Sequence, residues 1–163
     1  MAKQVKAIPE GYYSLTPYFT IRDAAKAIDF YKKAFGAEEQ MRMDGPGGKI
    51  MHAEVRIGGS VLMLSDEIPG MEGSASPQSL GGTHAGVMIY CDNVDAWCDR
   101  AVKAGATLKQ PPTDMFWGDR YARLSDPFGY NWSIATHTKD LSQDEMRKAA
   151  EEFQKQMAAQ HKA

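Results

Sequence analysis

The chain carries the same order of predicted elements twice, and this repeat constrains the fold more than any other feature of its 163 residues. Asp23 and Asp92 each precede a segment with helical spacing of apolar residues, and Gly36 and Gly105 follow those segments at equal distances. Aspartate at this place caps a helix, and glycine ends one in the left-handed conformation. The halves match at an offset of 69 residues, with a shift of one residue if Asn93 is the cap.

Each half also predicts one strand before its helix and three strands after it. In the first half the leading strand lies within 14–22, and the later strands lie at 37–43, 50–57 and 60–65, separated by glycine-rich turns. In the second half, two consecutive prolines within 107–113 limit the first of the later strands. The predicted fold class is therefore α+β, with two βαβββ modules.

The segments outside the modules complete the predicted organisation. We expect an N-terminal extension (1–13), a first module (14–66), a linker or lid rich in glycine, proline and serine (67–83), a second module (84–138) and a C-terminal helix (139–163). Ser142 and Glu145 have capping-box spacing at the start of that helix. We expect the helix to pack on its own chain or on a partner subunit.

Composition narrows the classes of partner. The 19 Lys and Arg residues against 21 Asp and Glu give a net charge of -2, which supplies no broad attraction to nucleic acid or to an anionic membrane. Cys91 and Cys98 are too few for a disulfide framework, and the first residues lack the apolar run of a signal peptide or membrane span. We therefore expect a cytoplasmic protein with neither kind of partner.

Three stretches together resemble one known family. They are TPYFTIRDAAKAIDFYKKAFGAEE, MHAEVRIGGSVLML and WGDRYARLSDPFGYNWSIAT, in this order. Across residues 14–138 the chain resembles the vicinal oxygen chelate superfamily of glyoxalases, bleomycin resistance proteins and extradiol dioxygenases, and within it the PhnB-like branch. The resemblance implies that the modules curve their mixed sheets around a concave cavity, with the helices outside. It also implies a homodimer that binds a small molecule.

Metalloenzymes of that superfamily typically place a histidine on the first strand and a glutamate on the last strand of each module. The corresponding residues here are Thr16, Met63, Ser133 and Gly86, or Ala85 in the alternative register. A glycine has no side chain, a thioether is too soft for these ions, and a hydroxyl is a poor ligand. The resemblance therefore implies that the standard metal site is absent, and no cofactor is expected.

Residues 50–57 predict a strand with one polar face. Ala53, Val55 and Ile57 alternate with His52, Glu54 and Arg56. The polar residues should face the cavity. His52 and Glu54 are candidates for a general base and its orienting carboxylate, or for ligands of a displaced metal. The alternative is a hydrogen-bonded polar trio in which Glu54 is ion-paired with Arg56.

Further polar and aromatic residues have the same alternation on other predicted strands. The candidates for ligand contact are Tyr18, Thr20, Arg22, Tyr90, Tyr121, Arg123, Asn131 and Ser133, joined by Trp117, Asp119 and Arg120 at the predicted cavity mouth. Such walls suit a planar or anionic small molecule. The alternatives are cross-strand pairs or a dimer seam, and for Asp119 and Arg120 an ion pair within a turn. Residues 126–129 are interpreted as a turn only.

Three functional hypotheses follow. The first is a PhnB-like protein that binds a small organic molecule without the usual cation. The second is an enzyme of glyoxalase, lyase or dioxygenase type, with a divalent metal held by an atypical set drawn from His52, Glu54 and His84. The third is an interaction protein that acts through the C-terminal helix.

Overall fold

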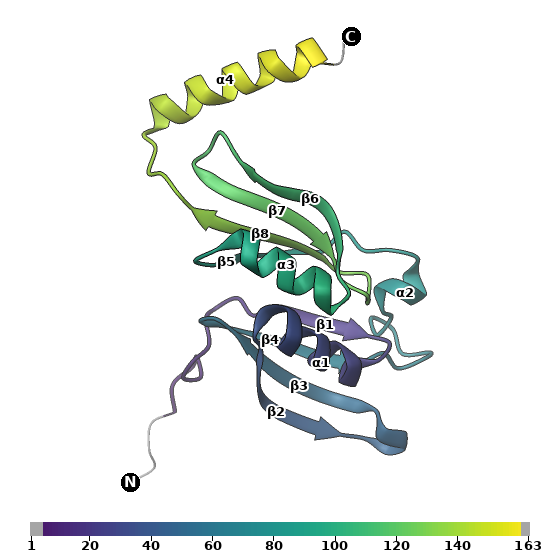
Figure 1. Ribbon diagram of the computed structural model, residues 1–163. Coiled ribbons are helices and arrows are strands. Elements are labelled where there is room, and N and C mark those ends of the chain that lie inside the picture. Colours follow the sequence, from purple (N-terminus) through teal and green to yellow (C-terminus); the bar gives the residue numbers. More distant parts are fainter. Residues whose placement is uncertain (1–4, 161–163) are drawn as a thin grey trace.

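The computed structural model describes residues 5–160 and contains two modules of the same topology (Figure 1). The elements of the first module are β1 (Tyr18–Ile21), α1 (Ala24–Phe35), β2 (Glu38–Asp44), a 3-10 turn (Pro46–Gly48), β3 (Ile50–Ile57) and β4 (Ser60–Asp66). Those of the second are β5 (Gly86–Tyr90), α3 (Val94–Ala104), β6 (Thr107–Asp114), β7 (Asp119–Ser125) and β8 (Asn131–His137). A short α2 (Pro77–Leu80) lies between the modules, and α4 (Gln143–Gln160) follows them.

The helix caps settle the register of the repeat. The Asp23 side chain accepts a hydrogen bond from the Lys26 amide at the start of α1, and Asn93, not Asp92, accepts one from Ala96 at the start of α3. Gly36 ends α1 with φ of 65°. The N-caps therefore match at an offset of 70 residues, which is the alternative with Asn93, whereas the glycines that end the two helices, Gly36 and Gly105, match at 69.

Each module forms a four-stranded mixed sheet. The strand orders are β1-β4-β3-β2 and β5-β8-β7-β6, with β1 parallel to β4 and β5 parallel to β8. The remaining pairs are antiparallel. This confirms the predicted α+β class with two mixed sheets and a C-terminal helix. The two sheets do not close on each other, so the faces predicted to surround a cavity are open in the single chain (Figure 1).

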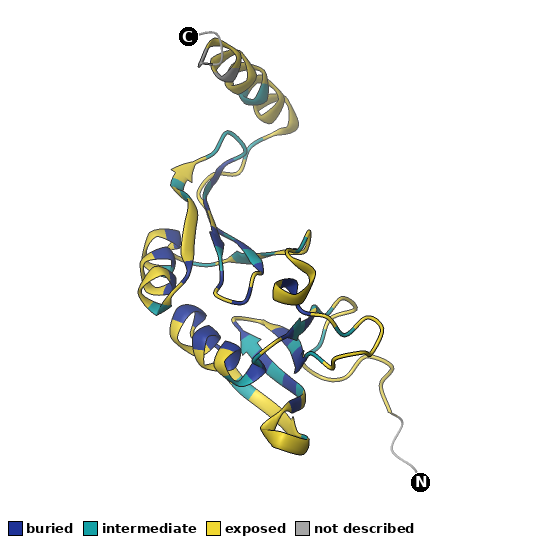
Figure 2. Ribbon diagram, turned by 90° about the vertical axis from the view of Figure 1, so that its right-hand side faces the viewer, coloured by how far each residue is buried: buried dark blue, intermediate teal, exposed yellow. Residues whose placement is uncertain are grey.

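One hydrophobic core joins the two modules. Helices α1 and α3 lie side by side on the same side of the sheets, and buried residues line the surfaces between helices and strands (Figure 2). Tyr31 and Trp132 are the largest fully buried side chains. The strand alternation in β3 is as predicted, because Ala53 and Val55 are buried against α1 whereas Glu54 is half-buried on the opposite face.

Asp126 connects the modules through this core. Its buried carboxylate accepts hydrogen bonds from the Phe128 and Tyr130 amides at 2.9 and 2.8 Å. It also accepts hydrogen bonds from the Trp132 indole at 3.0 Å and the Tyr31 hydroxyl at 2.9 Å. The Tyr31 bond crosses between modules, so residue 126 does more than shape the turn predicted from the sequence.

The segment expected to be a linker or lid is anchored to the first module. Glu67 accepts hydrogen bonds from the Ser76 amide at 3.0 Å, the Ser79 hydroxyl at 2.6 Å and the Arg22 guanidinium at 3.1 Å. The bonds from Ser76 and Ser79, together with Arg22, lower the pKa of Glu67 to about 2. These contacts tie the start of the segment to α2.

Helix α4 extends from the second module away from both sheets (Figure 1). The Phe153 ring lies 5.2 Å from the Phe116 ring, and this contact connects α4 to the loop before β7. Among residues 5–160, no helix has the length and apolar character needed to cross a bilayer. Residues 1–4 of the predicted extension and 161–163 of the predicted C-terminal helix lie outside the described part of the chain.

Candidate functional site

The faces of the two sheets that point away from α1 and α3 carry most of the predicted site residues. In the first module these are Tyr18, Thr20, His52, Glu54 and Arg56, and in the second they are Tyr90, Asp119, Tyr121, Arg123, Asn131 and Ser133. Strand register fixes this arrangement, because residues directly opposite each other share a face. Each open face therefore forms its own group of polar and aromatic side chains.

In the first module, Glu54 is the centre of the group. Its carboxylate accepts a short hydrogen bond from the Tyr12 hydroxyl and faces the His52 Nε2 at 3.2 Å. The Tyr12 bond, together with that of His52, lowers the pKa of the Glu54 carboxyl, whereas the same bond raises the pKa of Tyr12. Glu54 is therefore held as a carboxylate and is paired with Tyr12 and His52.

This pairing corrects one expectation. Among the ion pairs of residues 5–160 there is none between Glu54 and Arg56, so the polar trio predicted on β3 does not form in that way. Instead, the guanidinium of Arg56 packs close to Gly11, which adopts a φ of 83°. Besides His52, the partner of Glu54 is Tyr12 from the N-terminal extension, which strand alternation could not indicate.

The N-terminal extension also borders an open hollow on this face. A cavity of about 430 Å³ lies between residues 7–16 and the sheet. Its lining residues are Ala7, Ile8, Pro9, Tyr12, Tyr13, Ser14, Thr16, Glu54 and Met63. The volume lies within the roughly 300 to 1,000 Å³ of small-molecule pockets. Two of the four positions that would carry metal ligands in the superfamily, Thr16 and Met63, therefore lie in the wall of one hollow.

In the second module, Asp119 is the buried centre of a second group, with 3% of its surface exposed. Its carboxylate accepts hydrogen bonds from the Tyr90 hydroxyl and the Trp117 indole, each at 3.0 Å. The His137 Nδ1 lies 2.8 Å from the same carboxylate, and the His137 Nε2 lies 3.0 Å from Asp140. An imidazole held between two carboxylates is a geometry that can store and transfer a proton.

The candidate residues selected from the sequence do not include His137. The ring is half in solvent, with 52% of the side chain exposed, but both nitrogens have carboxylate partners. The register places Asp119 directly opposite His137 across β7 and β8. A cross-strand alignment of these two strands could have found the pair.

The other predicted residues separate into two sets. Tyr121 lies on the open face and shares a hydrogen bond of 2.7 Å with Ser133, while Arg123 is exposed on the same face. Arg22 and Arg120 are not brought into either group. Arg22 binds the anchored loop at Glu67, and Arg120 pairs with Asp95 on α3 and with Asp114.

The positions that would hold the superfamily's metal do not offer a suitable set of donors. Met63 presents a thioether and Gly86 no side chain. The Thr16 hydroxyl lies 3.5 Å from the Tyr13 carbonyl, and the Ser133 hydroxyl is bonded to Tyr121. Neutral hydroxyls and a thioether are poor ligands for zinc, nickel or iron, so the residues present do not fit the group.

The atypical set of His52, Glu54 and His84 is not assembled either. His52 and Glu54 lie on β3, whereas His84 is exposed just before β5 in the other module. Within the described residues, no three His, Cys, Asp or Glu side chains gather in an arrangement that could hold a metal ion.

The Asp119–His137 pair gives a pH-dependent prediction. The hydrogen bond to Asp119, followed by that to Asp140, raises the pKa of His137 above its usual 6.5. A raised folded-state pKa stabilises the protein below the unfolded-state pKa, and this contribution is lost as pH rises through the folded-state value. The stability difference between the wild type and His137→Gln should therefore be larger at about pH 6 than at about pH 9, as measured by urea unfolding.

A histidine titration followed by NMR provides the control. Asp119→Asn should lower the His137 pKa more than Asp140→Ala does, because Asp119 makes the larger contribution. A His137 pKa at or below 6.5 in the wild type would contradict the geometry.

Comparison with known proteins places the chain in a family. A profile of the Glyoxalase/Bleomycin resistance protein/Dioxygenase superfamily matches residues 16–134. An uncharacterized protein of Mycobacterium bovis is 45% identical over 138 residues, which cover 83% of this chain and 91% of that protein.

Two solved structures share the fold. TioX from Micromonospora sp. ML1 is 27% identical with a TM-score of 0.61, over 77% of this chain and 98% of TioX. TnmS3 from Streptomyces sp. CB03234, described as an antibiotic binding protein, is 26% identical with a TM-score of 0.59, over 82% of this chain and 100% of TnmS3. By the match over residues 16–134 and the relative at 45% identity, the chain belongs to the glyoxalase/bleomycin resistance protein/dioxygenase superfamily.

Proposed function

We propose that this protein is a PhnB-like member of the superfamily that binds a small organic molecule at the open sheet faces without a metal ion. The observation that carries the proposal is the hollow of about 430 Å³ beside Glu54 and Met63. Aromatic and apolar side chains form most of its wall, and Tyr12 and Glu54 supply a fixed polar edge. Such a wall suits a ligand with an aromatic part and a hydrogen-bond donor.

Two further features support binding rather than metal-assisted catalysis. The four positions discussed above present a thioether, two hydroxyls and a glycine, so the donor chemistry disfavours a divalent cation. One structural neighbour, TnmS3, is described as an antibiotic binding protein. Binding by this chain, with Tyr18, Thr20, Arg56, Tyr90, Tyr121, Arg123 and Ser133 as further contacts, is our proposal.

We also propose that the protein works as a homodimer in the cytoplasm. The open faces expose large apolar side chains, namely Tyr18, Met41, Met43, Met88 and Tyr90, at 40 to 61% of their surface. Several large apolar side chains exposed on the same open faces are typical of an interaction site. A second copy related by a two-fold axis would cover these side chains and complete the walls around the ligand.

The binding proposal is tested by native mass spectrometry of untagged protein purified from cells. The wild type should carry a small-molecule adduct, and Glu54→Gln should lower its occupancy about tenfold or more, because the carboxylate is the acceptor in the wall. Glu72→Gln is the matched control, since Glu72 is exposed in the loop after β4. Equal occupancy in the two variants, or wild type without any adduct, would overturn the proposal.

A further inference from the structure

The two modules contact each other along a boundary that we call the seam. Because the modules repeat the same elements, each end of the seam can be compared with the other. With the offset of 70 residues given by the N-caps, the pair Tyr18–Met63 corresponds to the pair Met88–Ser133 across the two parallel strand pairs. The counterpart of Phe19 is therefore Ile89, and the counterpart of Tyr130 is Ser60. In both the pair Phe19 and Tyr130 and the pair Ile89 and Ser60, one residue belongs to each module.

One end of the seam is filled by an aromatic stack. The Phe19 and Tyr130 rings lie 3.7 Å apart and 3° from parallel. The Tyr130 hydroxyl donates to the Thr20 carbonyl at 2.9 Å, on the outer edge of β1. Both rings are buried, so at this end the phenol ring of the residue just before β8 closes the gap between the modules.

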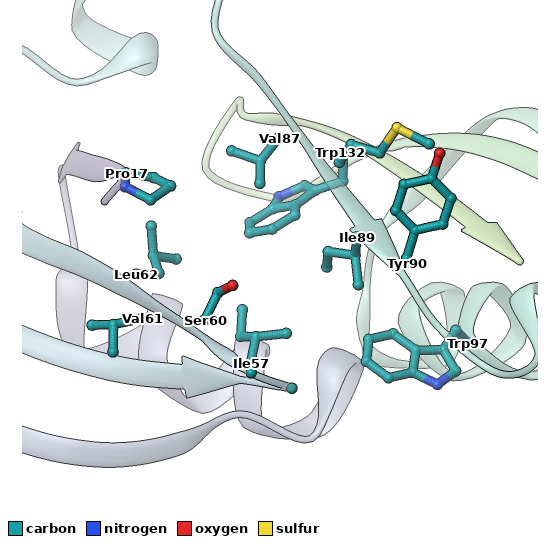
Figure 3. Close-up of a pocket in the computed structure, with 13 residues that line it drawn as sticks. Pro17, Ile57, Ser60, Val61, Leu62, Val87, Ile89, Tyr90, Trp97 and Trp132 are labelled. Atoms are coloured by element: carbon teal, nitrogen blue, oxygen red, sulfur yellow. The ribbon is translucent and has the colours of Figure 1, made fainter. Parts of the chain in front are cut away.

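The other end of the seam is hollow. Ser60 and Ile89 carry no aromatic ring and cannot form such a stack, and both line a cavity of about 340 Å³. Figure 3 shows Pro17, Ser60 and Leu62 on one side of it and Val87, Ile89 and Trp132 on the other. Trp97 and Ile57 extend the apolar wall. The volume is at the small end of the range for ligand pockets, roughly 300 to 1,000 Å³.

A hydrogen-bond acceptor lies at the equivalent place. The Cys91 amide donates to Ala135 on β8, so the carbonyl of the preceding residue, Tyr90, points away from β8, at the free edge of β5. This carbonyl is the counterpart of that of Thr20, which accepts the Tyr130 hydroxyl. The hollow thus combines flat aromatic walls with one backbone acceptor at its edge.

We propose that this seam cavity, defined by Ser60, Ile89, Trp97 and Trp132, is a second ligand site that takes a small phenol. The ligand ring occupies the place that Tyr130 fills at the other end, and its hydroxyl donates to the Tyr90 carbonyl. The site is separate from the hollow beside Glu54, and it does not depend on the function proposed for that hollow.

The test is a titration of the full chain with p-cresol, which has the ring and hydroxyl of a tyrosine side chain, followed by the indole NMR signals. Trp97 and Trp132 should shift and saturate with half-saturation at about 1 mM or below. Trp117, bonded to Asp119 on the open face, is the internal control and should not move. No saturable shift up to about 10 mM would overturn the proposal.

Two variants fill the cavity from opposite walls. Ser60→Tyr and Ile89→Phe should each weaken p-cresol binding at least about tenfold, and Ser60→Tyr should raise the midpoint of thermal unfolding. Ser60→Ala keeps the space open and should bind p-cresol as the wild type does. Binding that survives in both filled variants would place p-cresol elsewhere and refute the seam site.

Discussion

Replacement of Asp126 by alanine is expected to lower the free energy of unfolding by about 3–5 kcal/mol, enough to unfold a marginally stable domain. The carboxylate satisfies four donors at 2.8 to 3.0 Å, and two of them come from Tyr31 and Trp132 in the common core. Alanine would leave these donors buried without partners, and each such group carries a desolvation cost. Chemical denaturation followed by fluorescence measures the change.

Asp29→Ala is the matched control, because Asp29 is exposed on the outer surface of α1. Its effect should stay within about 0.5 kcal/mol, as is usual for surface substitutions. The loss of stability for Asp126→Asn should lie between those for Asp126→Ala and Asp29→Ala. The asparagine keeps one acceptor oxygen, but its NH2 group is a donor that faces the donor of the indole or the hydroxyl. An Asp126→Ala variant as stable as Asp29→Ala would show that the modules do not depend on this carboxylate.

The second large effect concerns the proposed dimer. Light scattering at micromolar concentration should give about twice the chain mass of 18.0 kDa for the wild type. The double variant Met41→Glu and Met43→Glu should weaken association by about 100-fold or more, because unpaired carboxylates would be buried in an apolar contact. Both methionines lie opposite Glu54 and His52 in the strand register, on the open face of the first module.

Lys33→Glu provides the control for a change of charge alone, since Lys33 is exposed on α1, on the other side of the sheet. This variant should remain dimeric. A wild-type mass of one chain by light scattering would refute the dimer. The exposed apolar faces would then have to bind a different partner.

Much of the fold could be predicted from the sequence because it depends on local chemistry. A few neighbouring residues are enough to predict the helix caps at Asp23 and Gly36 and the alternation of buried and polar residues around Val55. The one-residue ambiguity between Asp92 and Asn93 could not be resolved in this way, since both side chains can accept the capping hydrogen bond. The curvature of the two sheets around a common cavity is implied by the resemblance alone. It depends on contacts beyond a single module, and in the single chain the sheets do not close on each other.

The polar groups of the site were harder to predict because their partners are distant in the chain. The sequence predicts the face of Glu54 and its pairing with His52, but its second partner, Tyr12, comes from an extension 42 residues away. Asp119 was selected as a ligand residue, whereas the structure buries it beneath Tyr90 and His137. Periodicity gives the face of each side chain, and only the tertiary fold gives its hydrogen-bond partner.

The most direct test of metal-independent binding compares ligand occupancy before and after treatment with a chelator, with the metal content measured on the same untagged sample. We predict that the small-molecule adduct persists at unchanged occupancy and that divalent metal stays far below one ion per chain. Loss of the adduct on chelation, with recovery on addition of one equivalent of zinc, nickel, manganese or iron, would contradict the account.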